Sequence, residues 1–420
     1  MLIIYGALSL GGVETFFLRI AKQRYLSGKK TKILLYHPEN NNSDLLNEVK
    51  KYAEVFNLSD VSDTPFLSKF FKLTSKYNKL KVEKLIDGVE QIHVFKGEDA
   101  LIAYSFTSML RVNIPISVGF YHYVYYLWGG KRVPYFERIN RKFVLEFLPK
   151  QLLLLFSKDS QELYSKYTGY DYSQSNSFSI GVLDKEYSVE ILTTKEKKIK
   201  ICCVGRLVRF KTYNLSIIST VKMLIDKGYD VVLDIYGEGP LRVAMEDEIK
   251  RYNLFDSVKL KGALDYSLFD DVVSKYDIFV GTGTAIVQAS ALSIPSITAL
   301  DNLIEARSYG FFSKVYDRQY GRNDLPIETV DFSTLIESYA NSTLEEINIL
   351  RLEHYNCVSR FYISSSVNSL ESLCSIPMPK NKFKASLPLL IYDVSRLLHY
   401  TREKLDSKYR KYRQSLPYLD

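Results

Sequence analysis

The chain has 420 residues, of which 46% are hydrophobic, so it can bury more than one core and is not a disordered protein. Its formal net charge is +8, and from Lys380 to Asp420 ten Lys or Arg residues face four Asp or Glu residues. A basic excess confined to one end of the chain indicates an anionic partner surface rather than general adhesion.

No targeting or membrane-spanning segment is predicted. The opening MLIIYGALSLGG lacks the basic start of a signal peptide. Residues 112–130 are uncharged but contain Pro115 and His122, and they change from strand-like to aromatic and polar, which argues against a spanning helix. The four cysteines form no Cys-x-x-Cys pair and no spacing suited to a metal, so we expect a reduced, cytoplasmic setting.

Apolar runs alternate with amphipathic segments in the first half of the chain, as expected of a parallel sheet covered by helices. Val13, Phe16, Phe17 and Ile20 recur at helical spacing after the first run. The predicted strands are residues 2–5, 31–36, 100–104, 116–120 and 152–156.

A second series of the same kind follows a charged, weakly patterned linker at residues 183–197. It predicts a helix over 215–225, and residues 344–373 are expected to be helical and to close the second domain. The predicted strands are residues 200–204, 231–236, 258–260, 278–280 and 296–300.

This pattern predicts two Rossmann-like α/β domains followed by a helical tail. The domains are residues 1–183 and 198–350, with a closing helix at 351–376 and a tail at 377–420. In the tail, one face of a helix carries apolar residues and the rest is rich in Lys and Arg. Such a helix either rests on an anionic membrane surface or packs on the protein body with a solvated basic face. The apolar residues are Leu390, Val394, Leu397, Leu398, Leu405, Tyr409 and Tyr412.

Two glycine-containing motifs open helices after predicted strands. Gly11 and Gly12 follow the first strand, where a close backbone approach and a helix N-terminus favour a phosphate, although the same pattern is common in structural turns. The segment 281–289, GTGTAIVQA, combines backbone donors and hydroxyls at Gly283 and Thr284 with a helix start, which suits a phosphate.

Two further loops follow strands of the second domain. The loop GRLVRFKT starts at Gly205 and places Arg206 and Lys211 before a helix, where fixed positive charge can bind a diphosphate. In isolation it would be read as a solvated basic loop, and its position after a buried strand favours binding. The turn YGEGPL is mainly structural, and its Glu238 is counted among the substrate-binding candidates.

These motifs resemble, in order, those of the family 4 retaining glycosyltransferases, over roughly residues 1–375. The residues that carry the resemblance are GGVETFF, SIGVLDKE, GRLVRFK, YGEGPL and YDIFVGTGTAIVQASALSIPSI. The resemblance implies a GT-B fold with two domains facing across a cleft, a nucleotide-sugar donor such as a UDP- or GDP-sugar, retention of configuration, and no metal or other cofactor. The sequence also lacks Asp-x-Asp, the usual metal–diphosphate motif of the other major glycosyltransferase fold.

The resemblance also assigns roles. Arg206 and Lys211 match the pair that binds the donor diphosphate, and Gly12 matches a glycine near the same phosphates. His122 is similar in placement to a histidine that contacts the transferred sugar, although a lone histidine beside aromatic residues is more often structural. The family's glutamate pair is replaced by Val280 and Gln288, and a glutamine can still hydrogen-bond ribose hydroxyls.

The expected function is therefore hexosyl transfer, with retention, onto a glycan or lipid-linked acceptor in the synthesis of a surface polysaccharide such as lipopolysaccharide or capsule. The protein is expected to be peripheral on the inner face of the cell membrane, held there by residues 380–420, with no nucleic acid as partner. Two alternatives stay open, a non-catalytic GT-B partner or scaffold protein and a GT-B sugar-nucleotide epimerase. A Rossmann dehydrogenase is disfavoured, because the opening glycines do not form G-x-G-x-x-G.

Overall fold

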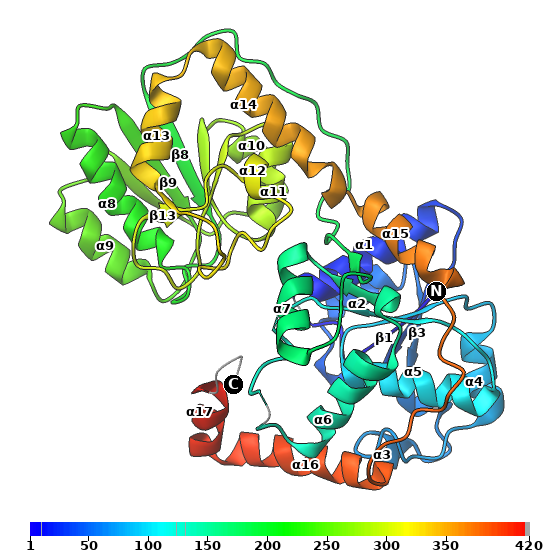
Figure 1. Cartoon of the computed structure of the whole chain (residues 1–420). Helices are drawn as coiled ribbons and strands as arrows, with labels where there is room; N and C mark the ends of the chain where they lie inside the picture. Colours follow the sequence, from blue (N-terminus) through cyan, green and yellow to red (C-terminus); the bar gives the residue numbers. More distant parts are fainter. Residues whose placement is uncertain (10, 123, 131, 416–420) are drawn as a thin grey trace. The chain divides into compact units, whose positions relative to one another are not determined.

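The computed structural model describes residues 1–9, 11–122, 124–130 and 132–415. The chain divides into two compact α/β units (Figure 1). Unit 1 consists of Met1–Gly181 together with Ile363–Asp420, and unit 2 is the continuous segment Val182–Tyr362. The chain therefore leaves unit 1 once and returns to it.

Unit 1 is built on a seven-stranded parallel sheet with the order β3-β2-β1-β4-β5-β6-β7. Its central strands are buried on both faces, which explains why they read as continuous apolar runs in the sequence. The strands are β1 (Leu2–Tyr5), β2 (Lys32–Leu35), β3 (Glu54–Asn57), β4 (Ile92–Val94), β5 (Ile116–Gly119), β6 (Leu153–Leu155) and β7 (Asn176–Ser177).

Helices cover this sheet, and α1 does so with the fully buried Phe16, Phe17 and Ile20. The α-helices of unit 1 are α1 (Gly12–Leu26), α2 (Ser43–Val49), α3 (Pro65–Ser68), α4 (Lys79–Ile86), α5 (Gly97–Leu110), α6 (Tyr135–Arg141), α7 (Lys158–Thr168), α15 (Ile363–Glu371), α16 (Leu389–Leu405) and α17 (Ser407–Ser415). Shorter helical turns are η1 (Pro38–Asn40), η2 (Leu58–Val61), η3 (Lys142–Phe147), η4 (Lys150–Leu152) and η7 (Ser372–Ser375).

Four of the five strands predicted for this half are confirmed, and the one at residues 100–104 is wrong. Those residues lie inside α5, which begins where the Asp99 carboxylate accepts a hydrogen bond from the Lys96 amide (2.9 Å). Ala100, Leu101, Ile102 and Ala103 are all buried. A helix buried on nearly every side shows no helical period in its sequence, and its short apolar run resembles a strand.

Unit 2 is built on a five-stranded parallel sheet with the order β10-β9-β8-β11-β12, next to a small antiparallel pair. All five strands and the helix predicted for it are confirmed. The strands are β8 (Ile199–Val204), β9 (Val231–Tyr236), β10 (Val258–Gly262), β11 (Ile278–Gly281), β12 (Ser296–Thr298), β13 (Arg307–Ser308) and β14 (Val330–Asp331). The helices are α8 (Tyr213–Asp226), α9 (Arg242–Arg251), η5 (Tyr266–Leu268), α10 (Phe269–Val273), α11 (Thr284–Ala291), α12 (Phe312–Val315), α13 (Phe332–Asn341), α14 (Leu344–Cys357) and η6 (Val358–Phe361).

The segment predicted as the closing helix of the second domain is divided between the two units. Helix α14 ends at Cys357 in unit 2, and α15 packs on α1 in unit 1, where Glu371 pairs with Arg24 and Lys29. Within unit 2 the outgoing and returning segments run side by side, because the Val182 amide donates to the Phe361 carbonyl (2.8 Å).

The tail predicted at residues 377–420 belongs to unit 1. Helix α16 packs beside α6 and beside the segment that follows α3. Its buried residues are polar or aromatic: Tyr392, Asp393, Arg396 and His399. Among the residues that the structure describes, none of the helices is both long and apolar enough to span a membrane.

Candidate functional site

The loop between β8 and α8 carries the two predicted diphosphate-binding cations. Arg206 is exposed, and the ammonium of Lys211 lies 3.0 Å from the position that a Cβ atom on Gly205 would occupy. Burial lowers the pKa of Lys211, the carboxylate of Asp301 opposes that effect, and Arg206 lowers the pKa further. The two cations therefore act on each other at one loop, which favours an anion placed between or beside them.

The turn at the end of β9 supports this loop through contacts between backbones. Gly205 donates its amide to the Tyr236 carbonyl (2.9 Å), and Leu207 donates to the Glu238 carbonyl (3.0 Å). A Cβ atom on Gly237 would lie 1.9 Å from the Gly205 carbonyl oxygen, and Gly237 has a φ of 153°. The glycine is required by this close approach, so the YGEGPL turn has a structural role toward the cationic loop.

Glu238, a predicted substrate-binding residue, is exposed in that turn. Its Oε1 accepts a hydrogen bond from the Arg242 guanidinium (2.9 Å) and lies 3.4 Å from the position of a Cβ atom on Gly262. In the structure the side chain thus forms a surface ion pair with the first residue of α9.

The predicted glycine-threonine motif follows β11. Gly283 has a φ of 73° and precedes the first residue of α11, and both Gly283 and Thr284 are exposed. The hydroxyl of Tyr320 donates to the Gly283 carbonyl (3.1 Å), which fixes the turn. The N-terminus of α11 therefore offers amide groups at an accessible position at the carboxyl edge of the sheet.

Asp301 lies next to the cationic loop and was missed in the sequence. Its backbone amide donates to the Gly321 carbonyl (2.9 Å), and the next amide, of Asn302, donates to the Phe210 carbonyl (2.6 Å). Burial raises the pKa of the Asp301 carboxyl to about 6, although Lys211 acts to lower it. Among the described residues, its Oδ1 has no hydrogen-bond partner. Its only sequence signal is its place after β12, where strand ends of one sheet converge.

The residues at the positions of the family's glutamate pair have other partners. Val280 is fully buried in β11, as its side chain requires. Gln288 is also buried, and its amide donates to Asp270 Oδ1 (2.8 Å), whose other oxygen pairs with Lys185 (2.6 Å). Gln288 thus links α11 to α10 and to the segment that enters unit 2.

In unit 1, Gly11 and Gly12 lie where α1 begins, after β1. The Glu14 carboxylate turns back to this end of the helix and accepts hydrogen bonds from Tyr5 (3.1 Å) and Ser9 (2.9 Å). Its Oε2 lies 2.4 Å from the position of a Cβ atom on Gly11, whereas nothing lies within 4 Å of that position on Gly12. An internal carboxylate therefore occupies the Gly11 side of the helix N-terminus, and Gly12 remains open.

His122 follows β5 at the same edge of the unit 1 sheet. Partial burial lowers its pKa, and its backbone carbonyl accepts from the Tyr125 amide (3.1 Å). The preceding Tyr121 packs edge-on against Phe16 of α1 (5.7 Å between ring centroids) and hydrogen-bonds to the buried His93 (2.6 Å). This contact brings the His122 loop to the helix that begins at Gly12.

The structure therefore gathers the predicted residues into two sets. Arg206, Lys211, Gly205, Gly283 and Thr284 lie at the carboxyl edge of the unit 2 sheet. Gly11, Gly12 and His122 lie at the carboxyl edge of the unit 1 sheet. In both units this is the edge at which ligands bind in open α/β folds.

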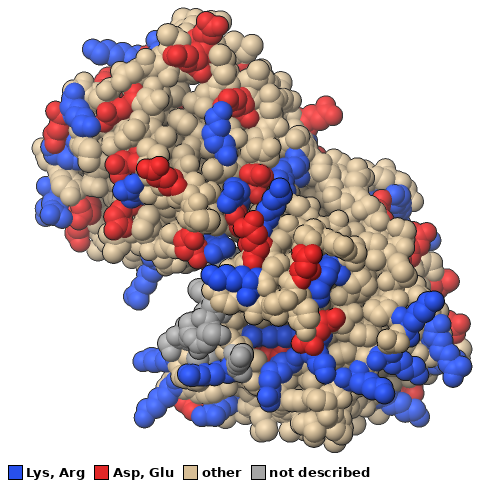
Figure 2. All heavy atoms as spheres, viewed as in Figure 1, with Lys and Arg blue, Asp and Glu red and all other residues tan. Residues whose placement is uncertain are grey.

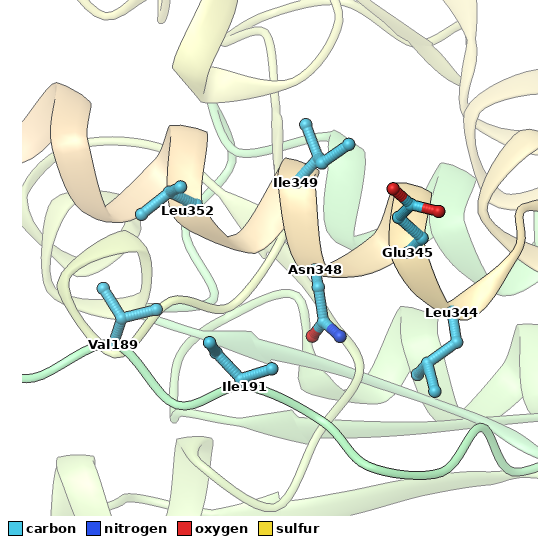
Figure 3. Close-up of a pocket in the computed structure, with 7 residues that line it drawn as sticks. All are labelled: Val189, Ile191, Leu344, Glu345, Asn348, Ile349 and Leu352. Carbon is cyan, nitrogen blue, oxygen red and sulfur yellow. The ribbon is translucent and has the colours of Figure 1, made fainter.

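A surface groove of about 540 Å³ in unit 2 is separate from these loops (Figure 3). Val189 and Ile191 face one side of α14, and Ile349 and Leu352 are among the α14 residues that line it. Asn348 exchanges two hydrogen bonds with the backbone of Leu192 (2.9 and 3.0 Å). These bonds attach the segment entering unit 2 to α14, which indicates a structural role for the groove.

Part of the chain is similar in sequence to known proteins. Residues 184–303 match the model of the glycosyl transferases group 1 family. A subunit of the phosphatidylinositol N-acetylglucosaminyltransferase of Homo sapiens is 32% identical over 110 residues, which cover 25% of this chain and 22% of that protein. Protein CapJ of Staphylococcus aureus is 30% identical over 110 residues, which cover 24% of this chain and 28% of that protein. The chain spans about a quarter of the length of these curated relatives.

Solved structures match over most of the chain. A glycosyltransferase from Rickettsia africae ESF-5 aligns with a TM-score of 0.61 at 14% identity, over 91% of this chain and 98% of that one. The lipopolysaccharide outer core galactosyltransferase WaaB aligns with a TM-score of 0.55 at 12% identity, over 89% and 98% of the two chains. Identities this low are evidence for the fold. The chain therefore has the two Rossmann-like units of the GT-B glycosyltransferases, and its second unit carries the group 1 match.

Proposed function

We propose that this protein is a glycosyltransferase that moves a sugar from a nucleotide-sugar donor, a UDP- or GDP-sugar, onto a glycan or lipid-linked acceptor. The observation that carries the proposal is the meeting of the Arg206–Lys211 loop with Asp301, at the same edge of the unit 2 sheet as the Gly283–Thr284 turn. Fixed cations beside exposed amides are suited to a diphosphate, and the family match covers both loops.

In the proposed reaction the bond between the anomeric carbon and the donor phosphate oxygen breaks, and the acceptor oxygen forms a new bond to that carbon on the same face. This attack on the same face retains the configuration. The acceptor proton passes to the departing diphosphate, so the reaction needs no separate general base. Arg206 and Lys211 stabilise the negative charge that develops on the diphosphate. Gly12 is proposed to bind near the phosphates, and His122 to contact the transferred sugar. We propose that neither a metal nor another cofactor is needed.

The proposed setting is the synthesis of a surface polysaccharide, at the inner face of the cell membrane. The human relative is named for phosphatidylinositol, a membrane lipid, and WaaB is named for lipopolysaccharide. Both names support a lipid-linked acceptor. The basic end of the chain supports a membrane position.

A non-catalytic GT-B partner protein is the second candidate. Two observations favour it, the burial of Val280 and the attachment of Gln288 to Asp270, because neither side chain replaces a glutamate of the family pair.

The test is donor binding followed by product analysis. A panel of nucleotide sugars is screened by calorimetry, and the best donor is incubated with a lipid-linked acceptor. We expect Arg206→Ala and Lys211→Ala each to weaken binding at least about tenfold, because a charge-assisted hydrogen bond contributes about 1.5–3 kcal/mol. Arg251→Ala, which removes an exposed arginine paired with Glu248 on α9, is the matched control.

The products separate the candidates. A glycosylated acceptor with the donor's anomeric configuration supports the proposal, and an inverted product contradicts retention. Binding without turnover supports the non-catalytic candidate, and an epimerised donor supports the epimerase. Unchanged binding by both loop variants would overturn the assignment of the site.

A further inference from the structure

We propose that the outer face of α16, together with the exposed end of α3, is a docking surface for an anionic lipid bilayer. This inference rests on the proposed function, in which the acceptor is linked to a lipid, and it adds the surface through which the enzyme would reach that lipid. It also decides between the two roles that the sequence left open for this helix, because the face that packs on the body is the polar one and the apolar face stays exposed.

The polar face of α16 is fixed to unit 1 by specific contacts. Asp393 accepts hydrogen bonds from the amides of Leu73 (3.1 Å) and Thr74 (3.1 Å). Arg396 lies 2.9 Å from the buried carboxylate of Glu98. Tyr392 donates to Asn140 of α6 (2.8 Å). These contacts fix the rotation of the helix about its axis, and they are made by the side that an ordinary amphipathic helix exposes to solvent.

The opposite face of α16 is apolar and exposed. Leu390 is 53% exposed, Val394 39%, Leu398 66% and Leu405 79%. At 3.6 residues per turn these positions form one stripe on the side away from Tyr392 and Arg396. Isolated exposed apolar residues are common, whereas a continuous stripe on a helix whose other face is already packed indicates a partner.

Helix α3 and the turn that follows it add two aromatic residues beside α16. Phe66 is 72% exposed and Phe70 is 43% exposed, and their rings pack edge-on at 5.6 Å. The guanidinium of Arg396 donates to the Phe70 carbonyl, so the aromatic pair is attached directly to α16. Figure 1 shows α3 beside the start of α16.

The charge around this surface selects the partner. From residue 380 to residue 413, each exposed charged side chain is cationic, and Glu403 and Asp406 are only partly exposed. In Figure 2, Lys and Arg side chains gather over the region where Figure 1 places α16 and α17. The exposed cations are Lys380, Lys382, Lys384, Arg402, Lys404, Lys408, Arg410 and Lys411.

Apolar residues flanked by Lys and Arg suit an interfacial helix on anionic lipid, where the long cationic side chains reach the headgroups. A second copy of the same surface would bring like charges together, which disfavours a dimer through this face. We therefore commit to the bilayer as the occupant.

The experiment is vesicle co-sedimentation with the full chain, using phosphatidylcholine vesicles with and without phosphatidylglycerol. Leu398→Glu places a charge in the stripe, and Leu80→Glu, at a 75% exposed position on α4, is the matched control. We expect Leu398→Glu to reduce partitioning at least tenfold and Leu80→Glu to leave it unchanged. Lys404→Gln combined with Lys408→Gln should weaken binding to the anionic vesicles, and Phe66→Ser should weaken it as well. Point variants replace deletion of the tail, since deletion would expose the core around Tyr392.

Three results would overturn the proposal. The first is that the wild-type protein binds vesicles equally well with and without the anionic lipid. The second is that Leu398→Glu binds vesicles as well as the wild-type protein does. The third is that the wild-type protein is a dimer in sedimentation velocity and Leu398→Glu converts it to a monomer. Donor binding is measured on the same samples. Loss of vesicle binding with retained donor binding supports the docking surface and leaves the proposed function standing. Retained vesicle binding by a chain that binds no donor contradicts the proposed function alone.

Discussion

At the scale of single residues, the candidate site depends on the charges of Lys211 and Asp301, which lie close to each other and are partly shielded from solvent. Lys211 is placed over Gly205, and the carboxylate of Asp301 acts on it directly. The position of the two cations in the fold could be predicted from the sequence, because they follow a recognisable strand. Asp301 could not, because the loop that brings it to Phe210 is defined by backbone hydrogen bonds that no local pattern reveals.

Asp301 makes the stability of unit 2 depend on pH. Its pKa is raised in the folded state to about 6 from an ordinary value of 3.8, so the folded protein holds this proton more tightly than the unfolded chain. Its favourable contribution is present below about pH 4 and is lost as the pH rises through 6. We therefore expect Asp301→Asn to raise the melting temperature of unit 2 at pH 7.5 but not at pH 4, as measured by calorimetry.

The control for that measurement is Asp247→Asn, at an exposed position on α9. A gain for Asp301→Asn of the same size at both pH values would contradict the assigned pKa.

At the scale of elements, the sequence predicts the strands whose residues are buried and have high β-propensity. It fails for strands that are only partly buried or that contain a polar residue. Strands β1, β2 and β8 coincide with apolar runs in the sequence. Strands β3 and β4 were missed, because β3 is only partly buried and β4 contains His93. The tail helix was predicted correctly as a helix, but its buried face could not be predicted. Its orientation depends on Glu98 and Asn140, which are far away in the sequence.

The turn after β9 offers a sharp test of the backbone contact. Gly237→Ala should destabilise unit 2 by at least about 2 kcal/mol, because its Cβ atom would lie 1.9 Å from the Gly205 carbonyl oxygen. Gly228→Ala is the control, since Gly228 also has a positive φ (88°) but nothing within 4 Å of its Cβ position. We expect that control to cost about 1 kcal/mol. Equal losses in chemical denaturation would show that strain at φ, and not the contact, explains the glycine.

The attachment of α16 can be tested in the same way. Arg396→Met leaves the buried Glu98 carboxylate with Lys72 (3.2 Å) as its ion-pair partner and should cost about 3 kcal/mol or more of unit 1 stability. Arg402→Met removes an exposed arginine that pairs with Asp406 at 3.6 Å and should cost less than about 1 kcal/mol. A small loss for Arg396→Met in urea unfolding would contradict the view that this ion pair fixes the helix.

At the scale of the whole molecule, the chain consists of two units with separate sheets and separate cores. The doubled α/β plan could be predicted from the alternation of apolar and amphipathic segments. The return of the chain to unit 1 could not, because α15 looks like a continuation of α14 in the sequence. Only its packing on α1 shows where it belongs.

Because the two units have no hydrophobic cluster in common among the described residues, we expect two unfolding transitions in calorimetry. Because the proposed diphosphate contacts of Arg206 and Lys211 are in unit 2, UDP or GDP should raise the melting temperature of one transition by several degrees and move the other much less. Asp301→Asn identifies the transition of unit 2. A nucleotide that shifts only the transition insensitive to Asp301→Asn would contradict donor binding by this unit.

The return of the chain to unit 1 also has a consequence for biosynthesis. Val367, Leu370, Leu373 and Tyr392 belong to the core that β1 and α1 begin, yet they leave the ribosome only after the whole of unit 2. Unit 2 is continuous and can close while translation is still in progress, whereas the N-terminal half must wait with apolar surface uncovered. A chaperone would therefore be needed most between the synthesis of Met1–Gly181 and the synthesis of the segment that starts at Ile363.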